Sequence, residues 1–277
     1  MISDSKELPL ISIVMPCFNC VDYIERSIRS IVEQDYPNIE LFIKDGGSED
    51  GTVEIIKYYA RKYPKVISWV SSKDKGQADA IKFGMKQLKG AVLSFLNADD
   101  VYKKNSLMKV GQYFLNHPEI MWAYGKGDII SPDDKKIRSF ITVYKNLWLW
   151  HFSYTNLLIL NYISQMSCFW RREAAKEVGE FDESQFYVMD YDYWLRLGKK
   201  FKAGVIPAYL GSFRIVAKSK SSKGFVQQFK DEYSVAGRYT QNPTILSLHR
   251  LHYNVVVLIY SIFKMFNSVS GNFYTNE

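Results

Sequence analysis

The sequence predicts an α/β fold with a mainly parallel sheet and a helical C-terminal extension. In the first half of the 277-residue chain, short apolar runs typical of strands alternate with segments of helical periodicity. Polar motifs follow the apolar runs of this half, while the final part of the chain is mostly helical in pattern. Hydrophobic residues make up 47% and charged residues 23%, a composition that supplies an adequate globular core.

The first strand is predicted at Ile11-Ser-Ile-Val-Met15, which Pro16 ends. The segment 22–33 follows as a helix, because Ile24, Ile28 and Ile31 fall on one helical face. By the same criteria we expect strands at 39–43, 66–70 and 91–96, and helices at 52–63 and 76–88.

After Tyr124 the regular alternation ends. We expect a hairpin over 128–142 that turns at Pro132-Asp133-Asp134, and then an aromatic segment that runs to Tyr162. The remaining expected elements are strands at 164–170, 203–206 and 209–214, and helices at 172–178, 191–199, 225–239 and 245–266.

The chain is basic, with a formal net charge of +7 and a pI near 9.0, which favours anionic partners. The sequence has no arginine-rich arm, zinc finger or helix-turn-helix signature, so we do not expect nucleic acid to be a partner. Aromatic residues reach 16%. Such rings pack on sugar C–H surfaces, but a core or a membrane-facing surface explains the excess equally well.

Cys17 and Cys20 have C-x-x-C spacing, but there is no second pair to complete a zinc site and no thioredoxin-like context. We expect a reduced, cytoplasmic protein without a signal peptide. No stretch has the roughly 20 consecutive apolar residues that span a bilayer. The apolar runs within 147–160 and 253–266 instead predict peripheral contact with an anionic membrane surface.

Four polar motifs follow predicted strands, at 16–19, 45–50, 74–76 and 97–100. In open α/β sheets, ligands bind in the crevice at the carboxyl ends of the strands. Each motif alone is weak evidence, because a turn or a helix cap explains it as well. Together they predict one polar binding edge.

Five motifs resemble, in order and spacing, those of family-2 glycosyltransferases with a GT-A fold. They are Pro16-Cys-Phe-Asn19, Asp45-Gly-Gly-Ser-Glu-Asp-Gly-Thr52, Asp74-Lys-Gly76, Asn97-Ala-Asp-Asp100 and Met189-Asp-Tyr-Asp192. The resemblance covers about residues 10–215. It implies a catalytic domain over 1–215, with a nucleotide-sugar-binding half (1–124) and an acceptor-side half (125–215), followed by a helical extension over 216–277.

The resemblance implies that Pro16, Phe18 and Asn19 bind the donor, that Asp45 accepts the N–H of a uracil ring, and that Asp74 and Gly76 contact the nucleotide or sugar. Gly46 stands where the family usually has a second acid. We assign Asp50 instead to a turn or helix cap.

Asp99 and Asp100 end an apolar strand, where two adjacent carboxylates are costly without a cation. A divalent metal, Mn²⁺ or Mg²⁺, would offset this cost and bridge the donor diphosphate. Asn97 replaces the first acid of the family's D-x-D motif, so we place the metal on Asp99 or Asp100 and expect Asn97 to contact ribose. A charged turn is the alternative.

Asp190 is the expected base that takes the proton of the acceptor hydroxyl, with Asp192 as the alternate. Met189 replaces an acid that often precedes this base in the family. Simple capping of the helix that starts here would explain the same residues.

Two further donor contacts are expected. Gln165 would face the donor or acceptor sugar, although a polar residue on a half-exposed strand is equally ordinary. Arg214, together with Lys218, would neutralise phosphate. Val216 stands about where related enzymes often have a histidine, so the contact of that histidine is absent or substituted.

The predicted activity is inverting transfer of one sugar from a nucleotide sugar, most simply a UDP-sugar, to a saccharide or lipid-linked saccharide in cell-surface polysaccharide or lipopolysaccharide synthesis. The chain lacks the Gln-x-x-Arg-Trp motif of processive synthases. The segment 145–162 would recognise the acceptor. A catalytically weak nucleotide-sugar-binding protein is the alternative, because four family positions are substituted. A dinucleotide oxidoreductase is disfavoured, because no G-x-G-x-x-G follows the first strand.

Overall fold

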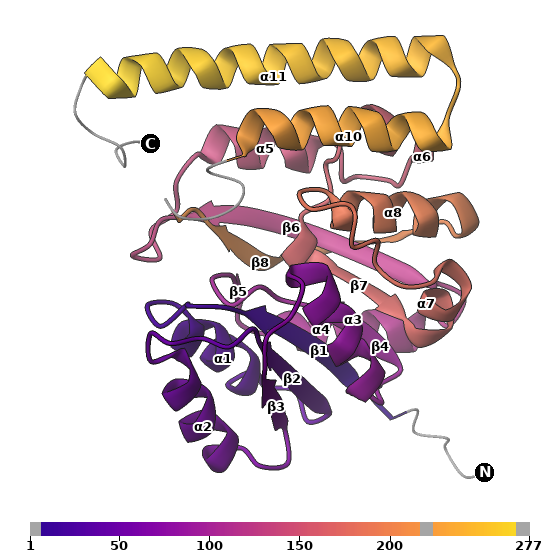
Figure 1. Cartoon of the computed structure of the whole chain (residues 1–277). Helices are drawn as coiled ribbons and strands as arrows, with labels where there is room; N and C mark the ends of the chain where they lie inside the picture. The colour runs from indigo at the N-terminus through magenta and orange to yellow at the C-terminus, as the bar shows by residue number, and fades with distance from the viewer. Residues whose placement is uncertain (1–6, 217–223, 270–277) are drawn as a thin grey trace.

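A computed structural model describes residues 7–216 and 224–269 and confirms the α/β fold. Eight strands form one sheet in the order β3-β2-β1-β4-β7-β6-β8-β5. Figure 1 shows this sheet between the N-terminal helices and a pair of long C-terminal helices. The sheet therefore runs through both halves of the predicted catalytic domain.

The first half follows the predicted order closely. Strands β1 (Ile11–Cys17), β2 (Ile39–Asp45), β3 (Ile67–Ser71) and β4 (Val92–Phe95) pair in parallel. Helices α1 (Ile24–Val32), α2 (Thr52–Lys62) and α3 (Gln77–Gln87) connect them. Strands β1, β2 and β4 are almost wholly buried, because α1 and α2 pack on one face and α3 packs on the other. Strand β3, at the edge of the sheet, is only partly buried.

The second half is a mixed sheet. Its strands are β5 (Val101–Tyr102), β6 (Trp122–Ile130), β7 (Cys168–Arg171) and β8 (Gly204–Arg214). Strand β7 lies antiparallel between β4 and β6, while β6 and β8 are parallel to each other. The helical elements are α4 (Ser106–Asn116), α5 (Ser139–Leu147), α6 (Tyr154–Ile159), the 3-10 turn Gln165–Ser167, α7 (Arg172–Val178) and α8 (Met189–Lys200).

Two sequence predictions in this half are wrong. The segment 128–142 is not a hairpin, because β6 continues to Ile130 in register with β8 and only one antiparallel bridge, Ile130 to Lys136, follows the turn. Arg138 then adopts a left-handed conformation (φ 52°) and leads directly into α5. The two strands predicted near 203–214 are one strand, β8, whose register shifts against β6 at Gly125–Gly127.

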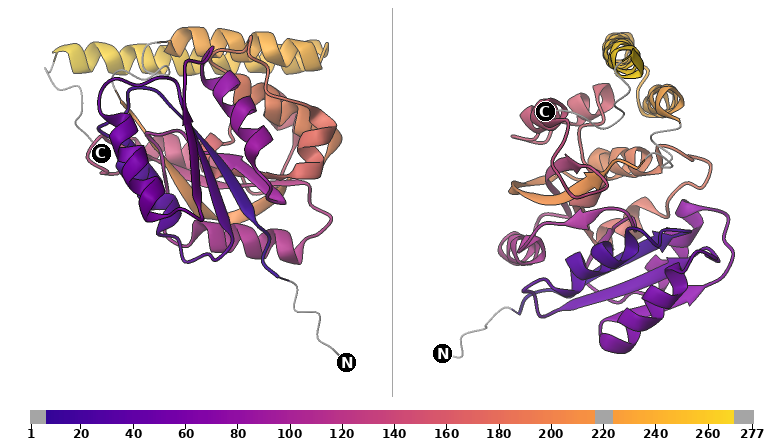
Figure 2. Two further views of the ribbon diagram at one scale, coloured as in Figure 1. Left: turned by 60° about the horizontal axis from the view of Figure 1, so that its bottom comes forward. Right: turned by 90° about the vertical axis from the view of Figure 1, so that its left-hand side faces the viewer.

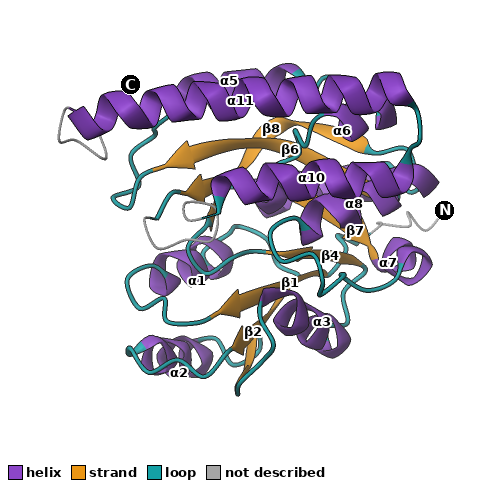
Figure 3. Ribbon diagram, turned by 45° about the horizontal axis from the view of Figure 1, so that its top comes forward, coloured by secondary structure: helices purple, strands orange, loops and turns teal. Residues whose placement is uncertain are grey.

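The C-terminal part is helical, as predicted, with α10 (Phe225–Tyr239) and α11 (Pro243–Val269). Helix α10 packs on α6 and α8, and α11 packs on α10 and α6. Figure 2 shows α11 at the opposite end of the molecule from the N-terminal helices, and Figure 3 shows α10 lying over α8. Within the described ranges, no helix is long and apolar enough to cross a membrane.

Candidate active site

The carboxyl ends of the first three strands meet at one edge. Cys17, Asp45 and Ser71 are neighbours in register across β1, β2 and β3. The loops that leave β1 and β2 are joined: the Asn19 backbone N–H donates to Ser48 Oγ (2.8 Å), and Asn19 Oδ1 accepts from the Glu49 N–H (3.0 Å). Two of the predicted motifs thus form one connected polar rim.

The flanking residues of the first motif differ in exposure. Pro16 lies inside β1, paired with Lys44, whereas the Phe18 ring is 62% exposed at the rim. Asn19 has a left-handed backbone conformation (φ 48°), which turns the chain away from the strand. Of these three predicted donor contacts, Phe18 and Asn19 are exposed and Pro16 is buried.

Asp45 is fully buried and surrounded by donors. Its Oδ2 accepts from the N–H groups of Gly47 (3.0 Å) and Ser48 (2.9 Å) and from Ser71 Oγ (2.6 Å), and its Oδ1 accepts from Ser48 Oγ (2.5 Å). Burial alone would raise the pKa of Asp45, but hydrogen bonds from Ser48 and Ser71 outweigh it and lower the pKa. The carboxylate holds the loop together, and its contact with a base stays a prediction.

Asp50 behaves as the sequence suggested, as a loop anchor at the start of α2. Its Oδ1 accepts from the Thr52 N–H (3.0 Å), and its Oδ2 accepts from the Val21 N–H (3.0 Å). The same carboxylate therefore ties the loop after β1 to the helix after β2.

Asp74 lies beside Gly46, which stands where the family usually has a second acid. A Cβ atom at position 46 would lie 3.1 Å from Asp74 Oδ2 and 3.3 Å from the Phe18 ring. Asp74 Oδ1 accepts from the Gly76 N–H (2.9 Å), where Gly76 has φ 118°. An acid at position 46 would therefore be in tight contact with Asp74, whose side chain would have to move by a few tenths of an ångström.

Lys44 was not indicated by any sequence motif, and its ammonium binds backbone carbonyls at the ends of β2 and β3. The side chain is almost completely buried on β2, and Nζ donates to the carbonyls of Asp45 (2.9 Å) and Ser72 (2.5 Å). It also lies 3.5 Å from Asp74 Oδ2. A lysine inside an apolar strand was the available signal, because a buried ammonium requires partners.

Asn97 sits in a chain of side-chain amides. Gln77 Nε2 donates to Asn97 Oδ1 (2.6 Å), and Asn97 Nδ2 donates to Asp100 Oδ2 (3.3 Å) and Gln165 Oε1 (3.5 Å). Gln165 Nε2 in turn donates to the Phe95 carbonyl (2.6 Å). The structure brings the predicted residues Asn97 and Gln165 together and adds Gln77, which no pattern had indicated.

Asp99 and Asp100 occupy different surroundings. Asp99 is half-buried, whereas Asp100 is 1% exposed and accepts from the Arg214 backbone N–H (2.9 Å) through Oδ1. Burial raises the pKa of Asp99, and burial followed by the charge of Asp99 raises the pKa of Asp100 well above its usual range. The predicted electrostatic cost of this pair is therefore present in the structure.

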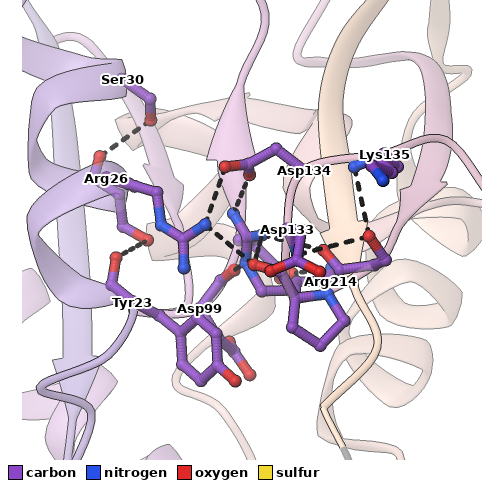
Figure 4. A network of polar contacts seen from close by, with 12 residues as sticks. Tyr23, Arg26, Ser30, Asp99, Asp133, Asp134, Lys135 and Arg214 are labelled. Atoms are coloured by element: carbon purple, nitrogen blue, oxygen red, sulfur yellow. Dashed lines mark hydrogen bonds and ion pairs between the residues drawn. The ribbon is translucent and has the colours of Figure 1, made fainter. Parts of the chain in front are cut away.

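Arg214 is fully buried in the network of Figure 4. Its guanidinium donates to the carbonyls of Asp99 (2.7 Å), Ser131 (3.0 Å) and Pro132 (3.1 Å) and to the carboxylate of Asp134 (2.6 Å). These acceptors direct the guanidinium at the 131–134 turn, so the geometry favours a positioning role over the predicted direct contact with phosphate. Lys218 lies outside the described residues.

Asp99 and Asp100 offer two carboxylates to a divalent cation after β4. Among the described residues, no group of three or more His, Cys, Asp and Glu side chains could hold a metal ion. Mg²⁺ and Mn²⁺ commonly use one or two carboxylates together with substrate phosphates. The raised pKa values of the adjacent Asp99 and Asp100 fit such a site, with the half-buried Asp99 the accessible ligand.

Asp190 and Asp192 begin α8 and differ in their partners. Asp192 is 3% exposed, pairs with Arg196 Nε (2.9 Å) and accepts from the Tyr239 hydroxyl (2.6 Å). Asp190 is half-buried, and its Oδ1 accepts the N–H of Tyr191 (2.8 Å). Burial raises the pKa of Asp190. The geometry thus favours Asp190 over Asp192 as a proton acceptor.

A small hollow lies between residues 75–79, which follow β3, and the start of α8. It is lined by 75–79 on one side and by residues of the 183–189 segment on the other, including Gly76, Gln77, Phe186 and Met189. Met189 directly precedes Asp190. The hollow therefore places the third predicted motif next to the fifth.

Comparisons with known proteins agree with these motifs. The sequence model described as "Glycosyl transferase family 2" matches residues 12–179. The chain is 26% identical over 216 residues to the putative teichuronic acid biosynthesis glycosyltransferase TuaG of Bacillus subtilis, covering 77% of this chain and 82% of that protein. It is also 26% identical over 250 residues to the Escherichia coli UDP-Glc:alpha-D-GlcNAc-diphosphoundecaprenol beta-1,3-glucosyltransferase WfgD, covering 89% and 93%.

Solved structures share the fold. The mannosyltransferase PcManGT from Pyrobaculum calidifontis, in complex with GDP-Man and Mn²⁺, aligns with a TM-score of 0.69 at 16% identity, over 96% of this chain and 77% of that one. S. aureus TarS in complex with UDP-GlcNAc aligns with a TM-score of 0.62 at 16% identity, over 81% and 65%.

Proposed function

We propose, from the premise that this chain belongs to glycosyl transferase family 2, that it moves a single sugar from a UDP-sugar to a saccharide or lipid-linked saccharide with inversion. The product would enter a cell-surface polysaccharide, as the names of TuaG and WfgD suggest. The observation that carries this proposal is the hollow between residues 75–79 and the start of α8, which Met189 lines and which Asp190, an acid of raised pKa, directly follows in the sequence.

In this proposal Asp190 takes the proton of the acceptor hydroxyl. The acceptor oxygen then forms a bond to the anomeric carbon from the face opposite the diphosphate, while the bond between that carbon and the diphosphate oxygen breaks. A carboxylate of raised pKa suits this step, because it holds a proton more strongly than an exposed acid does. Asp192 stays bound to Arg196 and supports the helix.

The donor would lie along the rim formed by Phe18, Asp45 and Asp74. Asn97 and Gln165, linked through their amides, would face the ribose or the sugar. Asp99, supported by Asp100, would hold Mn²⁺ or Mg²⁺, and the charge of the ion would stabilise the departing diphosphate. Residues 1–124 would thus serve the donor, and 125–215 would serve the acceptor.

We further propose that α5 and α11 present an apolar surface to an anionic membrane. Large apolar side chains are exposed on these helices and on the turn after α5: Phe140, Val143, Leu147, Trp150, Leu248, Leu251, Val255 and Leu258. The net charge of +7 and the exposed Arg250 on α11 suit acidic headgroups. A lipid-linked acceptor would then be presented at the same surface.

Thermal unfolding with a panel of nucleotides tests the donor. UDP and one UDP-sugar should raise the Tm in the presence of Mn²⁺, because a ligand at 100 times its Kd stabilises the native state by about 2.7 kcal/mol. GDP and GDP-mannose serve as matched controls. Stabilisation by guanine nucleotides alone would refute the UDP assignment. Donor binding without any hydrolysis of the UDP-sugar would support the alternative, a catalytically weak binding protein.

Vesicle flotation tests the membrane surface. The double variant Leu251→Glu with Leu258→Glu should lose binding to vesicles of anionic lipid, because two charges replace exposed apolar side chains of α11. Vesicles of neutral lipid and the surface variant Tyr58→Glu on α2 are the controls. Equal flotation of the altered and unaltered proteins would contradict the proposal.

A further inference from the structure

The turn after β6 brings one carboxylate to two guanidinium groups. Asp134 Oδ1 accepts from the Arg214 guanidinium (2.6 Å), and Asp134 Oδ2 accepts from that of Arg26 (2.8 Å). Figure 4 shows both contacts. Arg26 lies on α1 and Arg214 ends β8, so Asp134 joins two elements that are far apart in the chain.

The backbone of the turn also fixes Asp134. The Asp134 N–H donates to the Ser131 carbonyl (3.1 Å), and the Ser131 N–H donates to the Lys135 carbonyl (2.8 Å). Asp134 has a left-handed backbone conformation (φ 65°), which Asp and Asn adopt more readily than most residues with a side chain. Arg26 also donates to the Pro132 carbonyl (2.8 Å). The carboxylate is therefore held by the turn as well as by its ion pairs.

The Arg214 guanidinium has three residues with carboxylates among its neighbours but pairs with one of them. Its Nε donates to the backbone carbonyl of Asp99 (2.7 Å), and the Arg214 backbone N–H donates to Asp100 Oδ1 (2.9 Å). Within the described residues, the guanidinium forms its ion pair with Asp134 and not with the carboxylate of Asp99 or Asp100. The two carboxylates of the candidate metal site thus lie next to a buried arginine that is paired elsewhere.

The pairing with Asp134 matters because the Arg214 side chain is fully buried. Its other acceptors are neutral backbone carbonyls, and a buried cation without an anionic partner is costly. Burial alone would raise the pKa of Asp134, but hydrogen bonds from Arg26 and Arg214 outweigh it and lower the pKa. Asp134 is therefore ionised at neutral pH. Without this anion, the guanidinium would gain by turning to the carboxylate of Asp99 or Asp100.

We propose that Asp134 is a positioning residue for the metal site: it pairs with the Arg214 guanidinium and so leaves the carboxylates of Asp99 and Asp100 to a divalent cation. The inference rests on the proposed function, in which Asp99 holds Mn²⁺ or Mg²⁺. It deepens that proposal by giving a part in metal binding to the turn after β6, which belongs to none of the five motifs. A purely structural role, in which Asp134 only ties the turn to α1 and β8, makes different predictions.

Binding of Mn²⁺ alone to the full chain tests the inference, with the electron paramagnetic resonance signal of free Mn²⁺ as the readout. Asp134→Asn removes the charge and suits the left-handed backbone, so Arg214 should turn to the carboxylates and compete with the ion. We expect the Kd for Mn²⁺ to rise roughly tenfold. Asp133→Asn makes the same change in charge at an exposed neighbour and should alter the Kd by less than about twofold.

A double-mutant cycle tests whether Asp134 acts through Arg214. In the Arg214→Met background no guanidinium remains to compete with the ion, so adding Asp134→Asn should change the Kd by less than about twofold. The double variant removes both partners of the ion pair and leaves no unpaired buried cation, so it should fold. A tenfold loss of affinity in both backgrounds would overturn the inference.

Thermal unfolding of the same variants separates positioning from structural support. A lower Tm of Asp134→Asn, with the Mn²⁺ affinity of the unaltered protein, would also overturn the inference and leave Asp134 a structural residue. Asp99→Ala distinguishes this failure from that of the proposed function. Unchanged Mn²⁺ binding in Asp99→Ala would refute the metal site itself, and this inference with it.

Discussion

Asp45 on the donor side and Asp190 on the acceptor side are carboxylates in contrasting surroundings: Asp45 is fully buried, whereas Asp190 is half-buried. Asp45 accepts hydrogen bonds from two backbone N–H groups and two serine hydroxyls, and these lower its pKa despite burial. Asp190 accepts one backbone N–H, and burial raises its pKa.

These surroundings suit the two carboxylates to different tasks in the proposed mechanism. A carboxylate surrounded by donors stays ionised and works as a rigid part of the scaffold. A carboxylate with few donors holds a proton more strongly and can take one from a substrate. In the proposed mechanism, the donor side therefore supplies fixed geometry and Asp190 on the acceptor side supplies the proton acceptor.

The largest expected effect comes from Asp190→Asn. Loss of a general base should lower kcat by about 10²- to 10⁴-fold. The Tm at neutral pH should stay the same or rise. A carboxyl group whose pKa is raised in the folded state makes the folded protein less stable as pH increases through that pKa, and Asn removes this group. Initial-rate kinetics and thermal unfolding measure the two outcomes.

Asp192→Asn is the matched control two residues away. It weakens the pairing of a buried carboxylate with Arg196 and Tyr239, and we expect the free energy of unfolding to fall by about 3 kcal/mol. If Asp192→Asn abolishes turnover without loss of stability while Asp190→Asn does not, the assignments of the two residues must be exchanged.

Asp45→Ala should destabilise the loop that follows β2 on the donor side. The change leaves two N–H groups and two hydroxyls without their acceptor, so the free energy of unfolding should fall by about 3 kcal/mol. A lowered pKa means that this stability is present above the unfolded-state pKa of the carboxyl and is lost as pH falls through its folded-state pKa. The free energies of unfolding of the variant and of the unaltered protein should therefore differ less in acid than at pH 7.

Urea unfolding at pH 7 and at pH 3 measures this difference, with Ser71→Ala as the control that removes one donor and keeps the carboxylate. The same difference in stability at both pH values would contradict the assignment of Asp45 as a permanently ionised scaffold group.

The smallest expected effect comes from Asn97→Asp, at the boundary between the two sides. A third carboxylate beside Asp99 and Asp100 should tighten Mn²⁺ binding about tenfold, which corresponds to 1.4 kcal/mol. Without metal, the variant should be slightly less stable, because Asn97 no longer donates to Asp100. Calorimetric titration with Mn²⁺ gives the affinity, and unchanged affinity would place the ion elsewhere.

The sequence predicts the donor side well because its signals are local. Each strand there is followed at once by its polar motif and its helix, and parallel pairing brings the motifs to one edge. The predicted elements of residues 11–96 accordingly agree with the structure to within a few residues. Lys44 and Gln77 were missed because their partners come from neighbouring strands and loops.

The acceptor side depends on contacts between distant segments. The hairpin predicted at 128–142 fails because β6 pairs with β8, whose residues come much later in the chain. Three of the four acceptors of the Arg214 guanidinium lie in the distant 131–134 turn, which no local pattern indicates. Its contact with phosphate stays a prediction. Glu232 carries no local signal of its burial on α10, since a charged residue on an amphipathic helix is ordinarily solvated.

The antiparallel strand β7 has a consequence for how the chain reaches its native state. Strand β4 completes the parallel half, but its open side is covered only by β7, through the pairs Val92 with Arg171 and Leu93 with Trp170. Strand β5 likewise pairs with a strand that is synthesised much later, β8, through Val101 with Ser212. A ribosome that synthesises this protein therefore releases β4 with an uncovered edge, a form prone to association with other chains until β7 arrives.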